Sequence, residues 1–543
     1  MEIKSFFDNF ETMAEAPNGV QKLREMILQL AVQGKLVPQD PNDEPASVLL
    51  DKIRAEKKRL IKVGKIKKNE QLPVIHENEL PYRLPDSWVW ARFADLVYFE
   101  IGRTPPRKES INWAENGYPW VSISDLEHKQ VISSTKESIS EVAYNKIFKG
   151  KIVPAGTLLM SFKLTIGKIS VLGVDAFHNE AIISIFPFEA YLKEYFFRCL
   201  DGYDLLSNQS NAIKGHTLNK EKINAIFIAL PPLNEQKRIV AKVDELMALC
   251  DDLEARKQKT RQTCIQLNDA CIDKMLAARE PARFNKHWQR IHTNFDLLYS
   301  QPGNVNKLRQ TILQLAVQGK LVPQDPNDEP ASVLLEKIQI FSERRMKERK
   351  RNTAKPLKLI GPDEMPFVLP QGWVWVRLGD IISVSSGVGL TKTKMLEGGI
   401  PVYGGNGITG YHNTHNVDRK TIVIGRVGFY CGSVHLTPAK AWVTDNAFIT
   451  NYSEANIDQQ FLVWLLRATD LKQNDSATAQ PVISGRKIYP LVVALPPFNE
   501  QQRIVAKVDQ LMALCDDLET KLKKSQKRND RLMEAAVAEM LAA

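Results

Sequence analysis

Polar side chains on glycine-rich turns are the residues of this 543-residue sequence best suited to chemistry. Arginine hydrogen-bonds the edge of guanine and asparagine that of adenine, whereas lysine and serine position phosphates. Turns in the first half supply Arg103, Thr104, Arg107, Lys214, His216 and Thr217. Turns in the second half supply Tyr403, Asn406, Tyr411, His412, Asn413, Arg426, Arg486 and Lys487. Each residue alone is more often part of an ordinary turn than a base contact, but together they are the best candidates for contacts with nucleic acid.

Motifs for catalysis and metal binding are missing from the same sequence. The phosphate-binding pattern G-x-x-x-x-G-K-[ST] is absent, and Gly167-Lys168 lacks the upstream glycine. No H-E-x-x-H and no cluster of Cys and His offers a metal site. Glu127-His128-Lys129 has the E-x-K form of many nucleases, but chance often produces such triplets. We therefore expect no catalytic residue, metal ion or cofactor in this chain.

Residues 495–498, Leu-Pro-Pro-Phe, are similar to the (Asn/Asp/Ser)-Pro-Pro-(aromatic) motif of DNA methyltransferases that modify amino groups. In that motif the first side chain accepts a hydrogen bond from the target amino group, which leucine cannot do. The first half has Leu-Pro-Pro-Leu at 230–233 and lacks the aromatic ring as well. We interpret both segments as stiff entries to the helices that follow.

The elements that must position the polar turns come from an internal duplication. Residues 27–50 (ILQLAVQGKLVPQDPNDEPASVLL) return letter for letter at 312–335, 285 positions later (312 minus 27). Chance does not produce an identity of this length, so the chain consists of two related halves. The repeat predicts a helix that ends at Gly34 and a second helix with Asp43 as its N-cap and Pro45 in its first turn.

The duplication continues on both sides of two dissimilar inserts. LPDSWVWARFADL at 84–96 aligns with LPQGWVWVRLGDI at 369–381, and 229–254 matches 494–519 with an offset of 265 (494 minus 229). Each half is thus a shared frame around an insert of its own. We expect the inserts to be mixed α/β domains. The expected strands are 118–123, 157–162, 168–172 and 181–186 in the first insert and 400–403, 421–424 and 433–436 in the second.

Two long helices are expected after the inserts. The first has its apolar seam at Ile239, Val243, Leu246, Cys250 and Leu253, continued weakly by Cys264, Leu267 and Cys271. The second has its seam at Ile504, Val508, Leu511, Cys515, Leu518, Leu522, Leu532 and Ala536. Seams with a 3.5-residue period bury against another helix, so we predict that the two helices form an antiparallel coiled coil. The alternative is that each seam packs on its own insert.

Composition and charge narrow the class of protein. The net charge of +10 and the basic runs at 54–68 and 344–355 are compatible with nucleic acid, although a solvated helix face explains the runs equally well. Six cysteines without paired or C-x-x-C spacing indicate a reduced, cytoplasmic protein without zinc. No apolar run reaches the ~20 residues of a membrane helix, and the N-terminal residues do not resemble a secretory signal. A soluble protein without a membrane partner is expected.

The identical repeats admit two interpretations. They are either two equivalent pieces of core or two copies of one surface for two copies of one partner. Under the second interpretation the candidate partner-binding residues are Leu30, Val37 and Leu49 in the first copy and Leu315, Val322 and Leu334 in the second.

Taken together, these segments resemble the specificity subunits of type I restriction–modification systems. The resemblance rests on LAVQGKLVPQDPNDEPAS (30–47 and 315–332), the LPxxWxWxR lead-ins and the paired LPPxNEQxRIVAKVD segments. Residues 400–412, 422–432 and 442–448 also resemble a common target recognition domain of that family. The resemblance covers essentially the whole chain.

Combined with the helix prediction, the resemblance implies an α+β protein. Two mixed α/β target recognition domains would be separated by long helices forming an antiparallel coiled coil, with a pseudo-twofold internal repeat. The expected regions are an N-terminal helical repeat region (1–83), recognition domain 1 (84–230), a central helical repeat region (231–368), recognition domain 2 (369–495) and a C-terminal helix (496–543).

In this family each recognition domain reads one half of a bipartite DNA site, and the helices set the spacer and bind two methyltransferase subunits. The resemblance therefore implies a chain that is no enzyme by itself but part of an adenine-specific DNA methyltransferase and ATP-dependent endonuclease. Its partners would be double-stranded DNA, two methyltransferase subunits and restriction or translocase subunits. S-adenosylmethionine, ATP and Mg²⁺ would bind to those subunits.

Two other functions stay open at this point. A coiled-coil scaffold that assembles partners without reading DNA would have the same helices, although the charged, glycine-rich inserts argue against it. A chain that is itself a methyltransferase or nuclease would need the cofactor motifs that are missing here.

Overall fold

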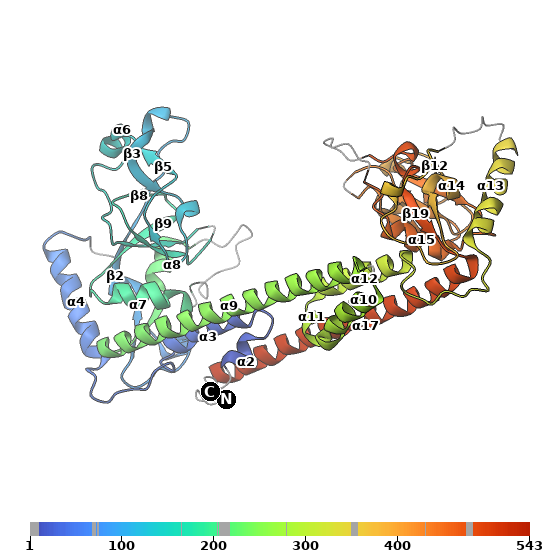
Figure 1. Ribbon diagram of the computed structural model, residues 1–543. Coiled ribbons are helices and arrows are strands. Elements are labelled where there is room, and N and C mark those ends of the chain that lie inside the picture. Colours follow the sequence, from blue (N-terminus) through green and yellow to red (C-terminus); the bar gives the residue numbers. More distant parts are fainter. Residues whose placement is uncertain are drawn as a thin grey trace. The chain divides into compact units, whose positions relative to one another are not determined.

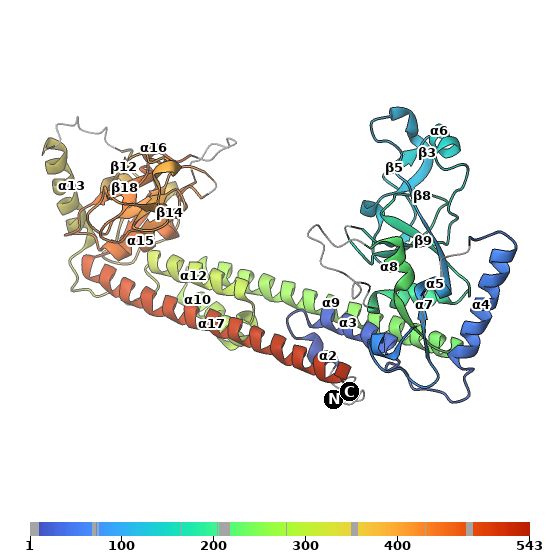
Figure 2. The same cartoon turned by 180° about the vertical axis from the view of Figure 1, so that it is seen from behind.

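The computed structural model describes residues 10–67, 72, 75–163, 165–203, 205, 218–278, 280–348, 357–428, 430–473 and 482–542. The chain forms two compact units, one made of Met1–Lys259 with Gln526–Ala543 and the other of Thr260–Ser525. Each unit contains one copy of the repeat and one mixed α/β domain, as Figures 1 and 2 show from opposite sides.

The first repeat forms the predicted pair of helices, α3 (Gly19–Val32) and α4 (Ala46–Lys62), after the short helix α2 (Phe10–Ala14). Gly34 ends the first of them with a left-handed φ of 72°. A Cβ at this position would lie 2.6 Å from Cγ of Pro85. The predicted stop is confirmed, and both the backbone conformation and the available space require glycine there.

Asp43 does not cap the second helix of the repeat. α4 begins after Pro45, without a hydrogen bond from a capping side chain. The Asp43 carboxylate is buried and instead accepts a hydrogen bond from Nη2 of Arg238 at 2.6 Å. The prediction was wrong because α4 starts at Ala46, two residues later than a cap at Asp43 would require, so that Pro45 takes the N-cap position instead of the first turn and the Asp43 carboxylate pairs with arginine.

The second repeat is built in the same way from α12 (Pro302–Val317) and α13 (Ala331–Glu348). Gly319 has a φ of 68°, and a Cβ there would lie 2.4 Å from Cγ of Pro370. Asp328 accepts a hydrogen bond from Arg503 at 2.6 Å. The helices α10 (Pro281–Thr293) and α11 (Phe295–Leu298) precede this repeat, and α11 begins 285 positions after Phe10, the first residue of α2 (295 minus 10).

The first mixed domain is built on a five-stranded sheet in the order β2-β9-β6-β7-β4 and a three-stranded sheet in the order β5-β3-β8. Its strands are β2 (Val97–Ile101), β3 (Trp113–Val121), β4 (Val131–Ile132), β5 (Glu137–Ile139), β6 (Leu158–Ser161), β7 (Ile169–Leu172), β8 (Phe177–His178) and β9 (Ile182–Pro187), and its helices are α5 (Phe93–Leu96), α6 (Glu141–Lys146), α7 (Leu192–Cys199) and α8 (Lys220–Ala225). The four strands expected in this insert are confirmed as β3, β6, β7 and β9. The three-stranded sheet lies at the end of the domain away from the start of helix α9 (Leu233–Leu276) in both views.

The second mixed domain repeats this plan although its sequence looks unrelated. Its sheets have the orders β12-β18-β15-β16 and β14-β13-β17. The strands are β12 (Ile382–Ser386), β13 (Ile400–Gly404), β14 (Gly407–His412), β15 (Ile422–Gly425), β16 (Val434–Leu436), β17 (Trp442–Val443) and β18 (Ala447–Tyr452), and the helices are α14 (Leu378–Ile381), α15 (Gln459–Ala468) and α16 (Gly485–Ile488). In both smaller sheets the central strand has one antiparallel and one parallel neighbour. The three strands expected here are confirmed as β13, β15 and β16.

A two-stranded ribbon closes the base of each domain. β1 (Val89–Arg92) pairs with β10 (Phe227–Leu230), and β11 (Val374–Arg377) pairs with β19 (Val492–Leu495), both antiparallel. The registers correspond position by position, because Val89 faces Leu230 as Val374 faces Leu495. The same strand pairing therefore brings together the two ends of each insert.

Two long helices, α9 and α17 (Phe498–Ala542), confirm the helices expected from the heptads. Each unit contains the beginning of one of them and the end of the other, as an antiparallel pair requires. In the first unit the α9 seam from Ile239 to Cys250 shares one apolar core with α3, α7 and Met533. This part of the seam therefore packs on the insert through α7, as the alternative interpretation supposed, but also on α3 of the frame and on Met533 of α17. None of the described helices has the length and apolar character to cross a membrane.

Farther along, the seams depart from the predicted positions. Leu267 is 43% exposed and Leu532 is 62% exposed, whereas Asn268 and Met533 beside them are buried. A helix with 3.6 residues per turn drifts away from a strict seven-residue repeat, so the buried stripe moves by one position. The prediction was wrong for these two leucines, and the side chain of Ala536 lies outside the described part of the chain.

Candidate nucleic-acid interface

Several loops of the first domain meet at one edge of its sheets. This first loop edge consists of residues 102–107 between β2 and β3, 162–163 after β6, and 179–180 between β8 and β9. Backbone hydrogen bonds join the segments, since Phe162 N donates to Ala181 O at 2.9 Å and Arg103 N donates to His178 O at 2.8 Å. Three of the predicted residues, Arg103, Thr104 and Arg107, lie at this edge.

The backbone at residue 103 is fixed by a close approach of two segments. Gly102 N donates to Ile182 O at 3.2 Å, and a Cβ on Gly102 would lie 2.1 Å from the carbonyl oxygen of His178. Nε1 of the buried Trp120 donates to the carbonyl oxygen of Arg103 at 3.0 Å. The main chain of this loop is therefore held in place, and its side chains project from a rigid base.

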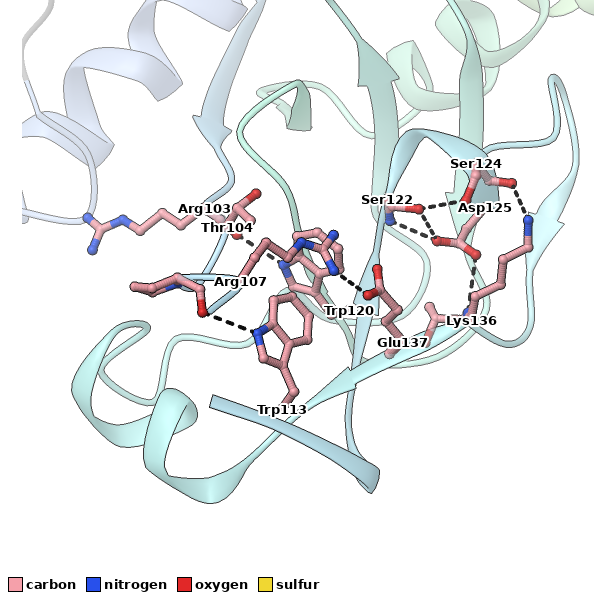
Figure 3. A network of polar contacts seen from close by, with 12 residues as sticks. Arg103, Thr104, Arg107, Trp113, Trp120, Ser122, Ser124, Asp125, Lys136 and Glu137 are labelled. Atoms are coloured by element: carbon pink, nitrogen blue, oxygen red, sulfur yellow. Dashed lines mark hydrogen bonds and ion pairs between the residues drawn. The ribbon is translucent and has the colours of Figure 1, made fainter. Parts of the chain in front are cut away.

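Arg107 lies against two tryptophans that contact each other, as Figure 3 shows. Its guanidinium carbon lies 4.4 Å from the ring centroid of Trp113 and 4.8 Å from that of Trp120. Its Nη1 donates to the carboxylate of Glu137. Cation–π and ion-pair contacts of this kind order a guanidinium before a ligand arrives. Arg103 extends away from the tryptophans, and its Nη1 donates to the carbonyl oxygen of Ile147 at 3.1 Å.

The first loop edge also presents a carboxylate. The Thr104 hydroxyl donates a hydrogen bond to Glu180. Burial acts to raise the pKa of Glu180, but this hydrogen bond and the charges of Lys163 and Arg107 outweigh it and lower the pKa overall. Glu180 is thus an ionised acceptor, suited to the exocyclic amino group of a base.

The Glu127-His128-Lys129 triplet serves the fold. Ile169 N donates to Nδ1 of His128 at 3.2 Å, and Nε2 of His128 lies 3.1 Å from the Asp201 carboxylate. Nζ of Lys129 lies 3.0 Å from the same carboxylate. Internal contacts occupy both side chains, so the nuclease interpretation of the triplet gains no support. In the described ranges, no three His, Cys, Asp or Glu side chains are grouped as metal ligands.

The second domain has an equivalent edge. This second loop edge consists of residues 387–391 after β12, 405–406 between β13 and β14, 426–428 after β15, and 444–446 between β17 and β18. Here Arg426 N donates to Asn446 O at 2.9 Å, as Phe162 N donates to Ala181 O in the first domain. The two edges therefore have the same backbone construction.

Backbone contacts hold the loop after β12 in the same way as the loop after β2. Val388 N donates to Val443 O at 2.9 Å, and a Cβ on Gly387 would lie 2.3 Å from that oxygen. Nε1 of Trp442 donates to the carbonyl oxygen of Val388 at 3.0 Å. The tryptophan comes from β17 in this domain, whereas Trp120 comes from β3, so the same contact is made from a different strand.

Arg426 is the predicted residue with the most open donors at the second loop edge. Its guanidinium carbon lies 5.4 Å from the ring centroid of Phe448, and Nη1 lies 3.4 Å from Oγ of Ser386. Its Nε is buried without a hydrogen-bond partner, and no carboxylate among the described residues pairs with it. A half-buried guanidinium with unused donors is suited to guanine or phosphate.

Three further candidates lie in or beside this edge. Asn406 is exposed in the turn after β13. Arg486 and Lys487 belong to α16, which follows Ile483, and Ile483 N donates to the carbonyl oxygen of Arg426 at 3.0 Å. The structure therefore brings α16 beside the loop after β15.

The remaining candidates of the second domain differ in exposure. Tyr403 is buried near His435, so it contributes to the core rather than to the surface. The His412 ring packs edge-on against Trp442, with 5.1 Å between centroids. Tyr411 is half-buried and Asn413 is exposed at the end of β14. In the first domain, Lys214, His216 and Thr217 lie outside the described residues.

Sequence reasoning missed several residues of the two edges. They are Trp113, Trp120, Glu180, Val388, Trp442 and Asp445. The only available signal was the offset of the duplication, because Glu180 and Asp445 occupy equivalent turns and 265 separates them (445 minus 180). Tryptophan and valine are mainly apolar, so a search for polar turns passes over them.

The partner-binding candidates lie mostly inside their own units. Leu30, Leu49 and Leu334 are buried in the main apolar core of their own half, with Val37 and Val322 half-buried against those cores. Leu315 is buried in a separate cluster with the end of α9 and with α11. Buried side chains hold the repeat together and offer no surface in this conformation. The expectation of a partner contact stays a prediction. The candidates for that contact are now the exposed residues of the same repeat.

The exposed part of the repeat is identical in both copies. We define the exposed repeat face as Pro38, Asp40, Pro41, Asn42, Glu44, Pro45, Ser47 and Val48, with Pro323, Asp325, Pro326, Asn327, Glu329, Pro330, Ser332 and Val333 as its second copy. A solvent-exposed residue is free to vary as far as packing is concerned, so packing alone does not account for identity on this face.

Buried polar contacts tie each repeat to the long helix of its own unit. Nε1 of Trp88 donates to Glu235 at 2.9 Å, and Nε1 of Trp373 donates to Glu500 at 2.9 Å. Both glutamates are 1% exposed, and burial raises the pKa of each against the hydrogen bonds that lower it. The frame is therefore duplicated down to single buried hydrogen bonds.

Comparison with known proteins agrees with this architecture. The family described as "Type I restriction modification DNA specificity domain" matches residues 85–261 and 370–527. The specificity subunit of the type I restriction enzyme EcoAI from Escherichia coli is 32% identical, over 96% of this chain and 94% of that one. That of EcoEI from Escherichia coli is 31% identical, over 95% of this chain and 93% of that one.

The crystal structure of an HsdS subunit from Thermoanaerobacter tengcongensis is similar at a TM-score of 0.40 and 18% identity, over 85% of this chain and 98% of that one. The five domain boundaries expected from the sequence stay predictions. Two matched segments of one specificity family, a duplicated frame and relatives aligned along nearly the whole length lead to one conclusion: the chain belongs to the family of type I restriction–modification DNA specificity subunits.

Proposed function

We propose that each loop edge reads one half of an asymmetric bipartite DNA site. The observation that carries this proposal is that two edges of equivalent backbone construction present different side chains, while the frames that hold them are duplicated in detail. The first edge presents Arg103, Arg107 and Glu180, and the second presents Val388 and Arg426. Different donors and acceptors on equivalent scaffolds are what two unlike half-sites require.

The chemistry of modification and cleavage belongs to other subunits. Two methyltransferase subunits dock on the two copies of the exposed repeat face, one on each, because identical surfaces take identical partners. Restriction or translocase subunits complete the assembly, and S-adenosylmethionine, ATP and Mg²⁺ bind in those chains. The assembly works in the cytoplasm, where the six cysteines, all unpaired in the structure, stay reduced.

The exchange of one domain tests the half-site assignment. Residues 100–228 are replaced by the corresponding segment of another specificity subunit, the chain is expressed with its methyltransferase partner, and methylated adenines in host DNA are mapped by single-molecule sequencing. One half of the methylated motif changes and the other stays. A motif that changes in both halves, or in neither, contradicts the proposal.

Arg426→Ala separates base reading from phosphate contact at the second edge. Loss of a guanine contact costs about 1–3 kcal/mol on the correct site and relaxes one position of that half-site. Binding is measured by titration of the assembled methyltransferase with matched and mismatched duplexes. An equal loss on every duplex identifies Arg426 as a phosphate contact.

The spacer is the part of the site assigned to the long helices. Residues 255–263 of α9 are nearly all exposed, so one heptad inserted there leaves the buried seams intact. At about 1.5 Å per residue the insertion lengthens the helix by roughly 10 Å, and the methylated motif gains spacer base pairs. An unchanged spacer contradicts the proposal that the long helices set the spacer length.

A scaffold that does not read DNA is the alternative function, and the named relatives give it no support. A gel shift of the assembled methyltransferase on a duplex carrying the mapped motif decides between them. Sequence-dependent binding that weakens with salt favours the DNA-reading function, and no shift at low salt favours the scaffold.

A further inference from the structure

We propose that residues 103 and 388 are a matched pair of specificity-determining positions, at which Arg103 reads a guanine in one half-site and Val388 a thymine methyl group in the other. This inference rests on the proposed function, because both residues act only if the loop edges face DNA.

Equivalent backbone contacts place the two residues at the same point of the two domains. The amide of residue 103 donates to His178 O at 2.8 Å, and that of residue 388 donates to Val443 O at 2.9 Å. The carbonyl oxygen of each accepts a hydrogen bond from a tryptophan Nε1 at 3.0 Å. Fixing both polar groups of a residue fixes the direction of its Cα–Cβ bond, so the two side chains leave their domains at equivalent places.

The close packing before each residue explains why only the side chain differs. A Cβ on Gly102 would lie 2.1 Å from a backbone oxygen, and one on Gly387 would lie 2.3 Å from the equivalent oxygen. Glycine is therefore required at both positions. The backbone is fixed at this point of the loop, so the two domains differ here in the side chain that follows the glycine.

Both side chains are available to a ligand. Arg103 is exposed, and its one side-chain hydrogen bond to the described residues runs from Nη1 to Ile147 O, which leaves most of its five N–H donors unused. Val388 is 55% exposed, although it is an apolar side chain on a rigid loop. A guanidinium with free donors matches O6 and N7 of guanine, and an exposed valine matches the C5-methyl group of thymine.

The neighbours of Arg103 are engaged more strongly. Arg107 is stacked on two tryptophans and paired with Glu137. Thr104 donates to Glu180. A base that contacts either of them must share or displace a charged partner, whereas Arg103 gives up at most one carbonyl contact.

The experiment uses the full chain assembled with its methyltransferase partner. Arg103→Lys keeps the charge but loses the two-pronged donor geometry, and Val388→Ala removes the two methyl groups of the side chain. Methylated motifs are mapped by single-molecule sequencing, and binding is titrated with duplexes changed at one base pair. Lys108→Ala, on the same loop as Arg103 and exposed, is the matched control.

Arg103→Lys is expected to reduce discrimination at a single guanine of the first half-site by roughly 5- to 150-fold, and to leave the second half-site unchanged. Val388→Ala is expected to reduce the preference for thymine at a single position of the second half-site by about fourfold or more. Lys108→Ala is expected to leave the motif unchanged. The reciprocal change Val388→Arg is expected to replace the thymine preference by a guanine preference.

Several results would overturn the inference. The inference is refuted if Arg103→Lys leaves the first half-site unchanged or if Val388→Ala leaves the second half-site unchanged. It is also refuted if a substitution weakens binding equally on all duplexes. A shift of the motif in Lys108→Ala shows that the effect is not specific to the position. Unfolding is recognised by a lowered melting temperature of the purified chain, and Arg103→Gln, which keeps a polar donor on a shorter stem, then replaces Arg103→Lys. The exchange of residues 100–228 separates the two proposals, because a motif that responds to the exchange but not to Arg103→Lys refutes only this inference.

Discussion

The two mixed domains of this chain share a strand order and share almost no sequence. The order β2-β9-β6-β7 in the first corresponds to β12-β18-β15-β16 in the second, and both carry a three-stranded sheet with one parallel and one antiparallel pair. At their loop edges the same backbone bonds recur with different side chains, so that Arg103 corresponds to Val388 and Phe162 to Arg426. Fold depends on which backbone groups pair, and these pairings tolerate any side chain that fits.

The frames show the opposite behaviour. Trp88, Glu235 and Arg238 have the same partners at nearly the same distances as Trp373, Glu500 and Arg503. Here the side chains themselves make the contacts, and a buried polar contact fails when either partner changes. The comparison shows that internal contacts constrain the side chains of the frame, whereas the backbone pairing at the loop edges leaves the side chains there free to differ.

The largest effect is expected when the buried tryptophan of a frame is removed. Trp88→Ala and Trp373→Ala each leave a cavity and take one of two hydrogen bonds from a buried glutamate, which keeps the bond from Gln39 or Gln324. Each substitution is expected to cost about 3–5 kcal/mol of unfolding free energy. The costs are compared by denaturant unfolding of the full chain, with Trp88→Phe and Trp373→Phe as milder controls. Clearly unequal losses in the two copies would break the equivalence of the frames.

The ion pairs of the frames give the next largest effect. Asp43→Asn and Asp328→Asn each remove a charge-assisted hydrogen bond, at a cost of about 1.5–3 kcal/mol near neutral pH. The hydrogen bonds from Arg238 and Arg503 lower the pKa of Asp43 and Asp328 in the folded chain, against the effect of burial. The stabilisation is therefore present above the ordinary pKa of 3.8 and is lost as the pH falls through the lowered folded values. Denaturation curves at several pH values measure this, and a difference from wild type that persists in strong acid would contradict it.

One buried position distinguishes the frames, and its exchange sharpens the comparison. Asn268 on α9 and Met533 on α17 are equivalent positions, and both amide atoms of Asn268 are buried without a hydrogen-bond partner among the described residues. Asn268→Met is expected to raise the unfolding free energy by about 1 kcal/mol, and Met533→Asn to lower it by about 1–3 kcal/mol. Thermal unfolding of both variants tests this. A loss of stability in Asn268→Met would show that the amide has a partner, such as a buried water.

The smallest effect is the pH dependence of stability that the buried glutamates cause. Burial raises the pKa of Glu235 and Glu500 in the folded chain above the ordinary 4.5, so the folded chain keeps these protons longer than the unfolded chain. Their contribution to stability is fully present below 4.5 and falls as the pH rises through the raised folded values. Glu235→Gln and Glu500→Gln do not titrate and are expected to remove this slope in equal parts. A slope that survives in the double variant would assign it to other groups.

The sequence by itself determined the duplication, the two long helices, the strands expected in each insert and the stops at Gly34 and Gly319. These features depend on local patterns, because apolar periodicity and glycine conformation are determined by residues close together in the sequence. The sequence also directed attention to Arg103, Arg107 and Arg426, since a charged residue on a glycine-rich turn is visible without coordinates.

Only the tertiary structure decided which of these residues share an edge and what holds them. Gly102 meets His178, Arg107 meets Glu137, and Asp43 meets Arg238 across long stretches of chain. The burial of Asn268 instead of Leu267 likewise follows from how a straight helix drifts under its neighbours. Such contacts depend on the geometry of the whole unit, and no local pattern in the residues encodes the partner that lies tens or hundreds of positions away.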